Sequence, residues 1–463
     1  MNAPLLALLF VATSVVGVST PSAVLEHVNV IDGTGAPAQP DRNVVIENGK
    51  IAAITPGADV TAHDGVTVLD LRGDSVMPGI VGMHDHLDYI RYPNIDAAGN
   101  FDRPSLMEEM AYSAPRLYLA NGVTTIRTTG SINPYEDLRL KEAIDAGTIP
   151  GPHMDVTGPY LEGANPGGPL THYQLRDAND ARQTVAYWAE RGVTSFKGYV
   201  HITRDELRAA IDEAHKHGLK VTGHLCSVTY PEAIEAGIDN LEHGFFTNTQ
   251  LDPDKKPDVC SASQGDATLE KMRAGTPEAE KLIAMLVGHH VAITSTLPNS
   301  AAASAPRIEP GALEAMSPSA RETYLYWRNR TVNKASESVK HEMELERAFV
   351  AAGGLLIAGP DPVGVGGNVP GFADHREIEL LVEAGFTPLE AIRIATFNGA
   401  KFLGRDDRIG SIAAGRNADL VVVKGDPAAH IEDIEKVEIV FKDGVGYDSR
   451  KLLDSVKGTY GDY

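Results

Sequence analysis

Between Pro78 and Gly404, eight short apolar segments alternate with amphipathic helical stretches, and this alternation restricts the fold more than any other feature. Strands separated by helices pair in parallel, and eight of them close a (β/α)8 barrel. An open doubly wound sheet is the alternative, but the chain has no Gly-rich dinucleotide fingerprint after its first segment. The sequence therefore predicts an α/β fold with a (β/α)8 barrel over residues 78–404. The eight segments are residues 79–84, 122–128, 153–158, 193–199, 219–225, 238–244, 290–296 and 355–361.

Both ends of the chain have strand patterns. Asn48-Gly49 separates two alternating stretches near the N-terminus, and Asp443-Gly444 does the same near the C-terminus. Such dipeptides favour two-residue β-hairpins. We therefore expect residues 24–77 and 405–463 to pair into a small β-sandwich domain formed by both termini.

Residues 1–23 have a composition of their own. An apolar run from Pro4 to about Val18 is too short to span a bilayer and has the length of a secretory h-region. No basic residue precedes it, so a buried N-terminal segment is the alternative. We expect a signal peptide over residues 1–23 and an exported protein, periplasmic or secreted; without such a leader the protein would be cytoplasmic. The two cysteines, Cys226 and Cys260, fit either compartment.

The formal net charge of −22 restricts the partners of this chain. Nucleic acids and anionic membranes bind basic patches, so we expect neither nucleic-acid binding nor membrane insertion. A small-molecule substrate is the expected partner. A homo-oligomer is compatible with the sequence, which does not give the oligomeric state.

Side chains of the metal-binding type stand at the ends of the predicted barrel strands. His84 and His86 close the first strand, and side chains two residues apart on a strand point to the same face. His224, His243 and Asp361 end strands five, six and eight. Catalytic residues of barrels gather at these carboxyl ends, and imidazoles with a carboxylate suit zinc and similar divalent ions. A metal centre would also provide the partners that so many inward polar groups need.

Lys197, at the end of the fourth strand, is predicted to face inward. A buried charged ammonium is costly, and an isolated lysine would extend to solvent. Beside four histidines and an aspartate this lysine needs another explanation.

Taken together, these motifs resemble the amidohydrolase superfamily, and within it the imidazolonepropionase-like and Xaa-Pro dipeptidase (prolidase) group. The resemblance covers nearly the whole chain after the leader. MPGIVGMHDH carries the H-x-H motif, and TSFKGY, GHL, EHG and AGPD carry the lysine, two histidines and the aspartate. VNVIDGTG is similar to the family's opening, and GSIAAGRNADLVVVKGDP to its ending.

The resemblance implies a centre of two divalent metal ions, zinc by analogy, with carbon dioxide converting Lys197 into a bridging carbamate. The first ion would take His84, His86, Lys197 and Asp361, and the second Lys197, His224 and His243. A hydroxide between the ions would attack the substrate carbonyl. Asp361 would be the general acid and base, taking the proton and passing it to the leaving nitrogen.

Two further residues are candidate substrate contacts. Tyr199, two residues beyond Lys197, either hydrogen-bonds a substrate carbonyl or only packs. Arg127 either binds a substrate carboxylate or pairs with a structural acid, and pairing is the commoner role of an inward arginine.

The expected function is metal-dependent hydrolysis of an amide or peptide C–N bond in an Xaa-Pro type dipeptide or an N-acyl amino acid. Three alternatives stay open. A mononuclear deaminase of the same superfamily conflicts with Lys197, and a relative without catalysis conflicts with the retained ligand residues. A lactonase or phosphotriesterase would use the same binuclear centre on an ester.

Overall fold

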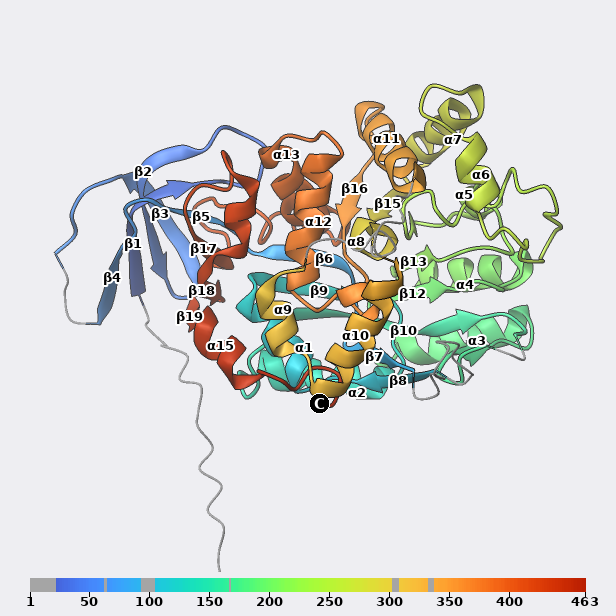
Figure 1. The fold of residues 1–463 in the computed structure, drawn as a ribbon, viewed down its shortest axis with the longest axis horizontal. Coiled ribbons are helices and arrows are strands. Elements are labelled where there is room, and N and C mark those ends of the chain that lie inside the picture. Colours follow the sequence, from blue (N-terminus) through green and yellow to red (C-terminus); the bar gives the residue numbers. More distant parts are fainter. Residues whose placement is uncertain (1–21, 62–64, 93–104, 166–167, 302–307, 332–336) are drawn as a thin grey trace, which may run out of the picture.

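A nearly closed barrel of eight parallel strands occupies the centre of the structure (Figure 1). The computed structural model describes residues 22–61, 65–92, 105–165, 168–301, 308–331 and 337–463. The barrel strands pair in chain order, and the first and last of them lie beside each other. The prediction of a (β/α)8 barrel is confirmed, and every strand overlaps its predicted segment. The strands are β6 (Ile80–Asp85), β9 (Val123–Thr128), β10 (His153–Glu162), β12 (Ser195–Gly198), β13 (Lys220–Gly223), β14 (Asn240–Leu241), β15 (Ala292–Ser295) and β16 (Leu356–Ala358).

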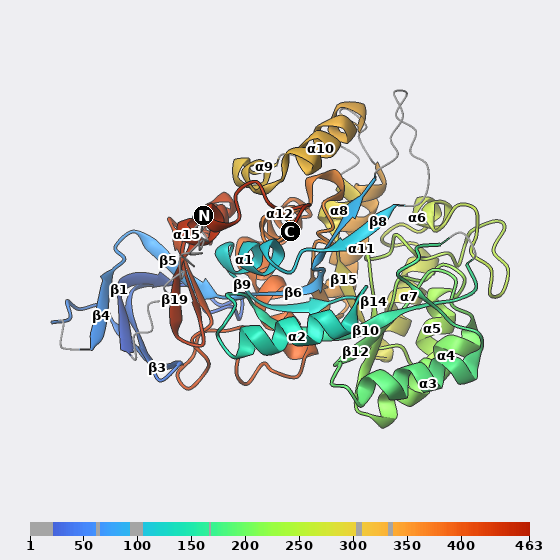
Figure 2. The same ribbon diagram turned by 90° about the horizontal axis from the view of Figure 1, so that it is seen from below.

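Helices cover the outside of the barrel. α4 (Arg204–Lys216) buries an apolar face that includes Leu207 and Ile211, and a capping box between Thr203 and Glu206 begins it. α3 (Ala178–Ala189) lies side by side with α4 (Figure 2). The other helices near the barrel strands are α1 (Ser113–Ala120), α2 (Pro134–Asp145), α5 (Tyr230–Ala236), α7 (Pro277–Gly288), α11 (Glu337–Ala351), α12 (Phe372–Glu383), α13 (Pro388–Arg393) and α14 (Gly399–Phe402).

A mixed sheet built from both ends of the chain lies beside the barrel, as predicted (Figure 1). Its strand order is β19-β18-β17-β5-β1-β2-β3, and β4 pairs with β1. Both expected hairpins form, with positive φ at Asn48, Gly49, Asp443 and Gly444, as two-residue hairpin turns require. The sheet has an apolar core of its own. Its strands are β1 (Ser22–Val30), β2 (Gln39–Glu47), β3 (Lys50–Pro56), β4 (Val66–Asp70), β5 (Asp74–Pro78), β17 (Leu420–Lys424), β18 (Val437–Lys442) and β19 (Val445–Asp448).

Long connections and the C-terminus surround the carboxyl end of the barrel. The connection after β14 contains α6 (Asp266–Lys271) and α7, and a disulfide joins its Cys260 to Cys226, which follows β13. The connection after β15 contains α8 (Leu297–Ala301), α9 (Pro310–Ala315), α10 (Pro318–Thr331) and α11. Between β6 and α1, β7 (Asp88–Arg91) pairs with β8 (Leu106–Glu109). α15 (Ser449–Ser455) packs on α1, and the Tyr460 hydroxyl beyond it donates to the Pro362 carbonyl.

The predicted signal peptide, residues 1–23, lies outside the described residues except for Ser22 and Ala23, which begin β1. In the part of the chain that the structure describes, no helix has both the length and the apolar character to cross a bilayer.

Candidate metal centre

The six predicted metal ligands lie together at the carboxyl end of the barrel. The imidazole of His243 is 4.6 Å from that of His84 and 4.4 Å from that of His224, measured between ring centroids. Lys197 Nζ lies 3.2 Å from His84 Nε2. His86 Nε2 lies 3.2 Å from Asp361 Oδ1. Five different strand ends therefore bring their side chains to one place.

His84, His86 and Asp361 form the tightest part of this group. Each offers a ligand atom within 4.8 Å of the others, which makes the three residues a candidate site for one metal ion. Asn299 of α8 donates a hydrogen bond to the second carboxylate oxygen of Asp361. One oxygen of this carboxylate therefore faces the histidines while the protein holds the other.

Two of the six residues have strained backbones. His243 has a φ of 63° and Asp361 a φ of 57°, in the left-handed region that side-chain-bearing residues rarely adopt. Such strain persists where the surrounding structure imposes it, and it is common at functional sites. Both residues belong to the group of predicted ligands.

The donor atoms fit a metal centre. His243 Nε2 is buried and has no hydrogen-bond partner among the described residues, whereas Nδ1 lies 3.0 Å from Thr296 Oγ1. Burial lowers the pKa of His84 to about 4 and that of His243 to about 3, so both imidazoles are neutral near pH 7. Neutral imidazoles with an unused nitrogen are the form that binds divalent metals.

Glu242 was missed at the sequence level, although it stands in the quoted EHG motif. Its carboxylate accepts a hydrogen bond from His84 Nδ1 at 2.7 Å, which leaves His84 Nε2 free to act as a ligand. Burial alone would raise the pKa of Glu242, but Arg127 and His84 outweigh it and keep that pKa well below its usual range. In the sequence, the feature that could have indicated Glu242 is a carboxylate directly before a candidate ligand histidine, His243.

Arg127 lies behind the ligand residues. Its guanidinium contacts Glu242 Oε1 at 2.7 Å and also donates to the Met83 carbonyl and to Asn240. The side chain is 1% exposed, and no arginine is among the described residues that line the neighbouring cavity. The geometry thus favours the second role considered for Arg127, pairing with a structural acid.

A cavity of about 270 Å³ opens above the ligand residues. Its wall combines the metal-binding side chains with aromatic and apolar ones. Tyr199 lines this cavity, and its ring lies 5.0 Å from the His224 ring. The lining residues are His86, Ile90, Met107, Tyr160, Lys197, Tyr199, His224, His243, Phe246, Thr247, Asn299, Ser300, Asp361 and Val363.

His172 supports this wall and was not singled out from the sequence. Its ring stacks on Tyr160 at 4.2 Å and meets Tyr199 edge-on at 4.5 Å. Both of its ring nitrogens are buried without a hydrogen-bond partner in the described residues, and burial lowers the pKa of His172 to about 3. His172 is not among the described residues that line the cavity, and its two unused ring nitrogens lie behind Tyr160 and Tyr199, which do line it.

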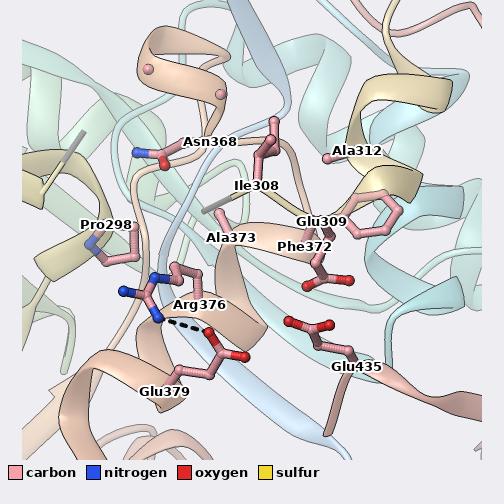
Figure 3. Close-up of a pocket in the computed structure, with 12 residues that line it drawn as sticks. Pro298, Ile308, Glu309, Ala312, Asn368, Phe372, Ala373, Arg376, Glu379 and Glu435 are labelled. Carbon is pink, nitrogen blue, oxygen red and sulfur yellow. Dashed lines mark hydrogen bonds and ion pairs between the residues drawn. The ribbon is translucent and has the colours of Figure 1, made fainter. Parts of the chain in front are cut away.

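A second pocket lies between α9 and α12 and is lined by Glu309, Arg376, Glu379, Phe372 and Glu435, among others (Figure 3). Its charged groups are already paired. Arg376 bonds Glu379 at 2.8 Å, and Glu309 contacts His375 Nδ1 at 3.2 Å. None of the six predicted ligands lines this pocket, so we place the candidate active site at the barrel end.

Residues 75–445 match the sequence profile of the Amidohydrolase family. The chain belongs to the amidohydrolase family. An uncharacterised protein of Mycobacterium bovis is 28% identical to this amidohydrolase over 233 residues, which are 46% of this chain and 54% of the relative. The chain thus spans about half the length of this curated relative.

Solved structures resemble this amidohydrolase over nearly its whole length. A Bifidobacterium longum protein assigned as a prolidase is 25% identical with a TM-score of 0.67, over 94% of this chain and 99% of that chain. A Xaa-Pro dipeptidase with methionine bound in its active site is 22% identical with a TM-score of 0.67, over 92% and 100%. The chain is therefore a member of the amidohydrolase family with the fold of the prolidases.

Proposed function

We propose that this amidohydrolase is a binuclear metal enzyme that hydrolyses the C–N bond of a dipeptide, of Xaa-Pro type, or of an N-acyl amino acid. The observation that carries the proposal is the position of Lys197. Its side chain is buried, and its Nζ contacts His84 Nε2 and the Thr129 carbonyl at 3.2 and 3.1 Å. Burying a charged ammonium group among histidines that are candidate cation ligands is unfavourable.

Conversion of Lys197 to a carbamate would give this side chain a role as a metal ligand. Burial lowers the pKa of Lys197 to about 8, which raises the neutral fraction of the amine near pH 7. The neutral amine attacks carbon dioxide, a nitrogen–carbon bond forms, and a proton leaves to solvent. The resulting anion would offer two oxygen donors to metal ions. One cation would then take His84, His86 and Asp361, and the other His224 and His243.

The chain's own residues perform the proton transfers in this proposal. When bound, the two metal ions supply a water of lowered pKa and polarise the scissile carbonyl. Asp361 accepts the proton of the attacking water and passes it to the leaving nitrogen as the C–N bond breaks. Asn299 holds the far oxygen of that carboxylate, so the near oxygen keeps its orientation.

The cavity supports a small, partly apolar amide as substrate. Its volume of about 270 Å³ suits a dipeptide better than a folded protein. Tyr160, Tyr199 and Phe246 provide apolar surface. With Arg127 turned away, the hydroxyl groups of the tyrosines and the imidazole of His172 are the groups proposed to orient the substrate's polar end.

A substrate panel with metal counting tests the proposal. Xaa-Pro dipeptides, dipeptides ending in other hydrophobic residues and N-acyl amino acids are assayed with zinc and bicarbonate. We expect turnover within this panel, two metal ions per chain, and at least about 10³-fold loss of turnover in Lys197→Ala. The matched control is Lys220→Ala, because Lys220 begins β13 and bonds the Phe402 carbonyl.

Full turnover and full metal content in Lys197→Ala would contradict the proposal. One metal ion per wild-type chain with activity on an amine-bearing ring would favour the deaminase alternative. Turnover confined to esters would favour the lactonase or phosphotriesterase alternative.

We further propose that the protein is exported, periplasmic or secreted. The Cys226–Cys260 disulfide supports this, because disulfides persist in oxidising compartments. Fractionation of the producing cells with N-terminal sequencing of the mature chain tests it, and an intact leader on a protein found in the cytoplasm would contradict it.

A further inference from the structure

A second cluster of metal-type side chains lies at the amino end of the barrel, opposite the candidate active site. His153 is the first residue of β10, Asp419 precedes β17, and Asp443 begins the turn between β18 and β19. Their ligand atoms all lie within 4.8 Å of one another. The cluster therefore joins the barrel, through His153, to the terminal sheet, through the two aspartates.

The spacing of the atoms fits a shared cation. His153 Nε2 lies 3.1 Å from Asp443 Oδ2 and 3.9 Å from Asp419 Oδ2. Two ligand atoms on one tetrahedral zinc ion are roughly 3.3 Å apart, because each bond is about 2.0–2.2 Å long. The His153 nitrogen is buried, and its approach to Asp443 lacks the alignment of a hydrogen bond.

The buried carboxylate of Asp419 is a second observation, independent of the atom spacing, that indicates a bound ligand. Its side chain is only 2% exposed, and Oδ1 accepts a hydrogen bond from the Asp443 backbone at 2.7 Å. Oδ2 points at the imidazole and has no hydrogen-bond partner within the described ranges. A buried carboxylate oxygen left in this way is unfavourable unless something binds it.

The charged groups around the cluster have a net negative charge, which a cation would balance. Lys442 Nζ lies 3.4 Å from Asp443 Oδ2, and Lys141 pairs with Asp145 at the edge of the cluster. Asp145 Oδ1 is 3.9 Å from His153 Nδ1, on the side of the ring away from the other aspartates. Three carboxylates against two ammonium groups leave one negative charge when His153 is neutral. A carboxylate behind a ligand histidine also favours the tautomer that binds metal through Nε2.

A comparable group of three side chains in the terminal sheet, Glu26, His27 and Asp59, already has hydrogen-bond partners. The His27 nitrogens bond Asp41 at 2.7 Å and Asp59 at 3.0 Å, and Glu26 accepts from the Val60 backbone. Asp59 is 84% exposed. The trio of Glu26, His27 and Asp59 therefore lacks the unused buried atoms that distinguish the His153 cluster.

We propose that His153, Asp419 and Asp443 bind one divalent cation of the zinc class, with water completing its coordination. The ion holds the amino end of the barrel to the terminal sheet. This site is separate from the candidate active site, and it does not depend on the proposed function.

Metal counting with two variants tests the proposal. Full-length protein is loaded with zinc sulfate, passed through gel filtration and analysed for zinc per chain by mass spectrometry. We expect His153→Arg and Asp443→Asn each to hold one zinc ion fewer than the wild type, with unchanged hydrolytic turnover. Arginine keeps a cation opposite the carboxylates but cannot bind zinc, and asparagine tolerates the φ of 51° at position 443.

Equal zinc content in the wild type and in either folded variant would overturn the proposal and leave an ion pair between the barrel and the sheet. Should neither variant fold, the wild type decides by modification of His153 with diethyl pyrocarbonate, measured by peptide mass spectrometry. Zinc is expected to reduce that modification at least about tenfold, and equal modification with and without zinc would overturn the proposal.

Discussion

Glu242 orients His84, one of the candidate metal ligands, from within the buried interior of the barrel. It accepts the hydrogen bond of His84 Nδ1 and is itself held by Arg127 and Thr222. In Glu242→Gln the shape remains but the negative charge is lost, so His84 Nε2 becomes a poorer ligand. We expect metal affinity to fall about 10–100-fold, measured by titration against a competing chelator.

The control for this prediction is Glu213→Gln on α4, whose carboxylate pairs with Lys216 outside the barrel. If the metal affinity of Glu242→Gln equals that of the wild type, Glu242 serves only as the ion-pair partner of Arg127.

A variant of His172 tests whether this residue contacts the substrate or only packs against the aromatic wall of the cavity. His172→Phe keeps the stack on Tyr160 but removes both buried ring nitrogens. If they bind the substrate, KM should rise about tenfold with kcat nearly unchanged, which corresponds to about 1.4 kcal/mol of lost binding. Steady-state kinetics on the best substrate of the panel measures this, and an unchanged KM would assign His172 to packing alone.

At the scale of elements, the Cys226–Cys260 disulfide ties the end of β13 to the long connection after β14. Its cysteines are 34 residues apart in the sequence, and His224 stands two residues before the first of them. Cross-linking a loop of this length restricts the unfolded chain and adds about 3–4 kcal/mol of stability. We expect the double variant Cys226→Ser/Cys260→Ser to lose that amount in urea unfolding.

Reducing agent provides the matched control. It should lower the stability of the wild type to that of the double variant and leave the variant unchanged. A wild type insensitive to reduction under unfolding conditions would show that the cysteines are not linked.

At the scale of the whole molecule, buried carboxyl groups should make stability depend on pH. Glu342 and Glu346 on α11 and Glu377 on α12 are buried, and burial raises the pKa of Glu342 and of Glu377 to about 8. Between the unfolded value of 4.5 and pH 8, the folded state holds more protons than the unfolded state. The stability that these protonated carboxyl groups contribute is therefore full below about pH 4.5 and is lost as pH rises towards 8.

Glu377→Gln tests this dependence, because glutamine stays neutral at every pH. In metal-free protein, the stability of the variant relative to the wild type should improve by about 3 kcal/mol between pH 5 and pH 8. Urea unfolding at both pH values measures it. A difference between the two proteins that does not change with pH would contradict the raised pKa of Glu377.

Features that depend on neighbours in the chain could be predicted from the amino-acid sequence alone. Short apolar segments that alternate with helical stretches predicted all eight barrel strands, and Asn48-Gly49 and Asp443-Gly444 predicted their hairpins. The six candidate ligands were predicted to meet because each ends a strand, and parallel strands in a barrel bring their carboxyl ends together. The structure places His84, His86, Lys197, His224, His243 and Asp361 in one group, and metal binding by this group stays a prediction.

The surroundings of these candidate ligands, in contrast, depend on how the elements pack in three dimensions. The Glu242–His84 contact joins residues 158 positions apart, and it depends on the register of strands that do not neighbour each other in sequence. The same holds for the turn of Arg127 towards Glu242, for His172 against Tyr160, and for the meeting of His153 with Asp419 and Asp443. Periodicity assigns a side chain to a face, but the partner on that face is set by how separate elements pack.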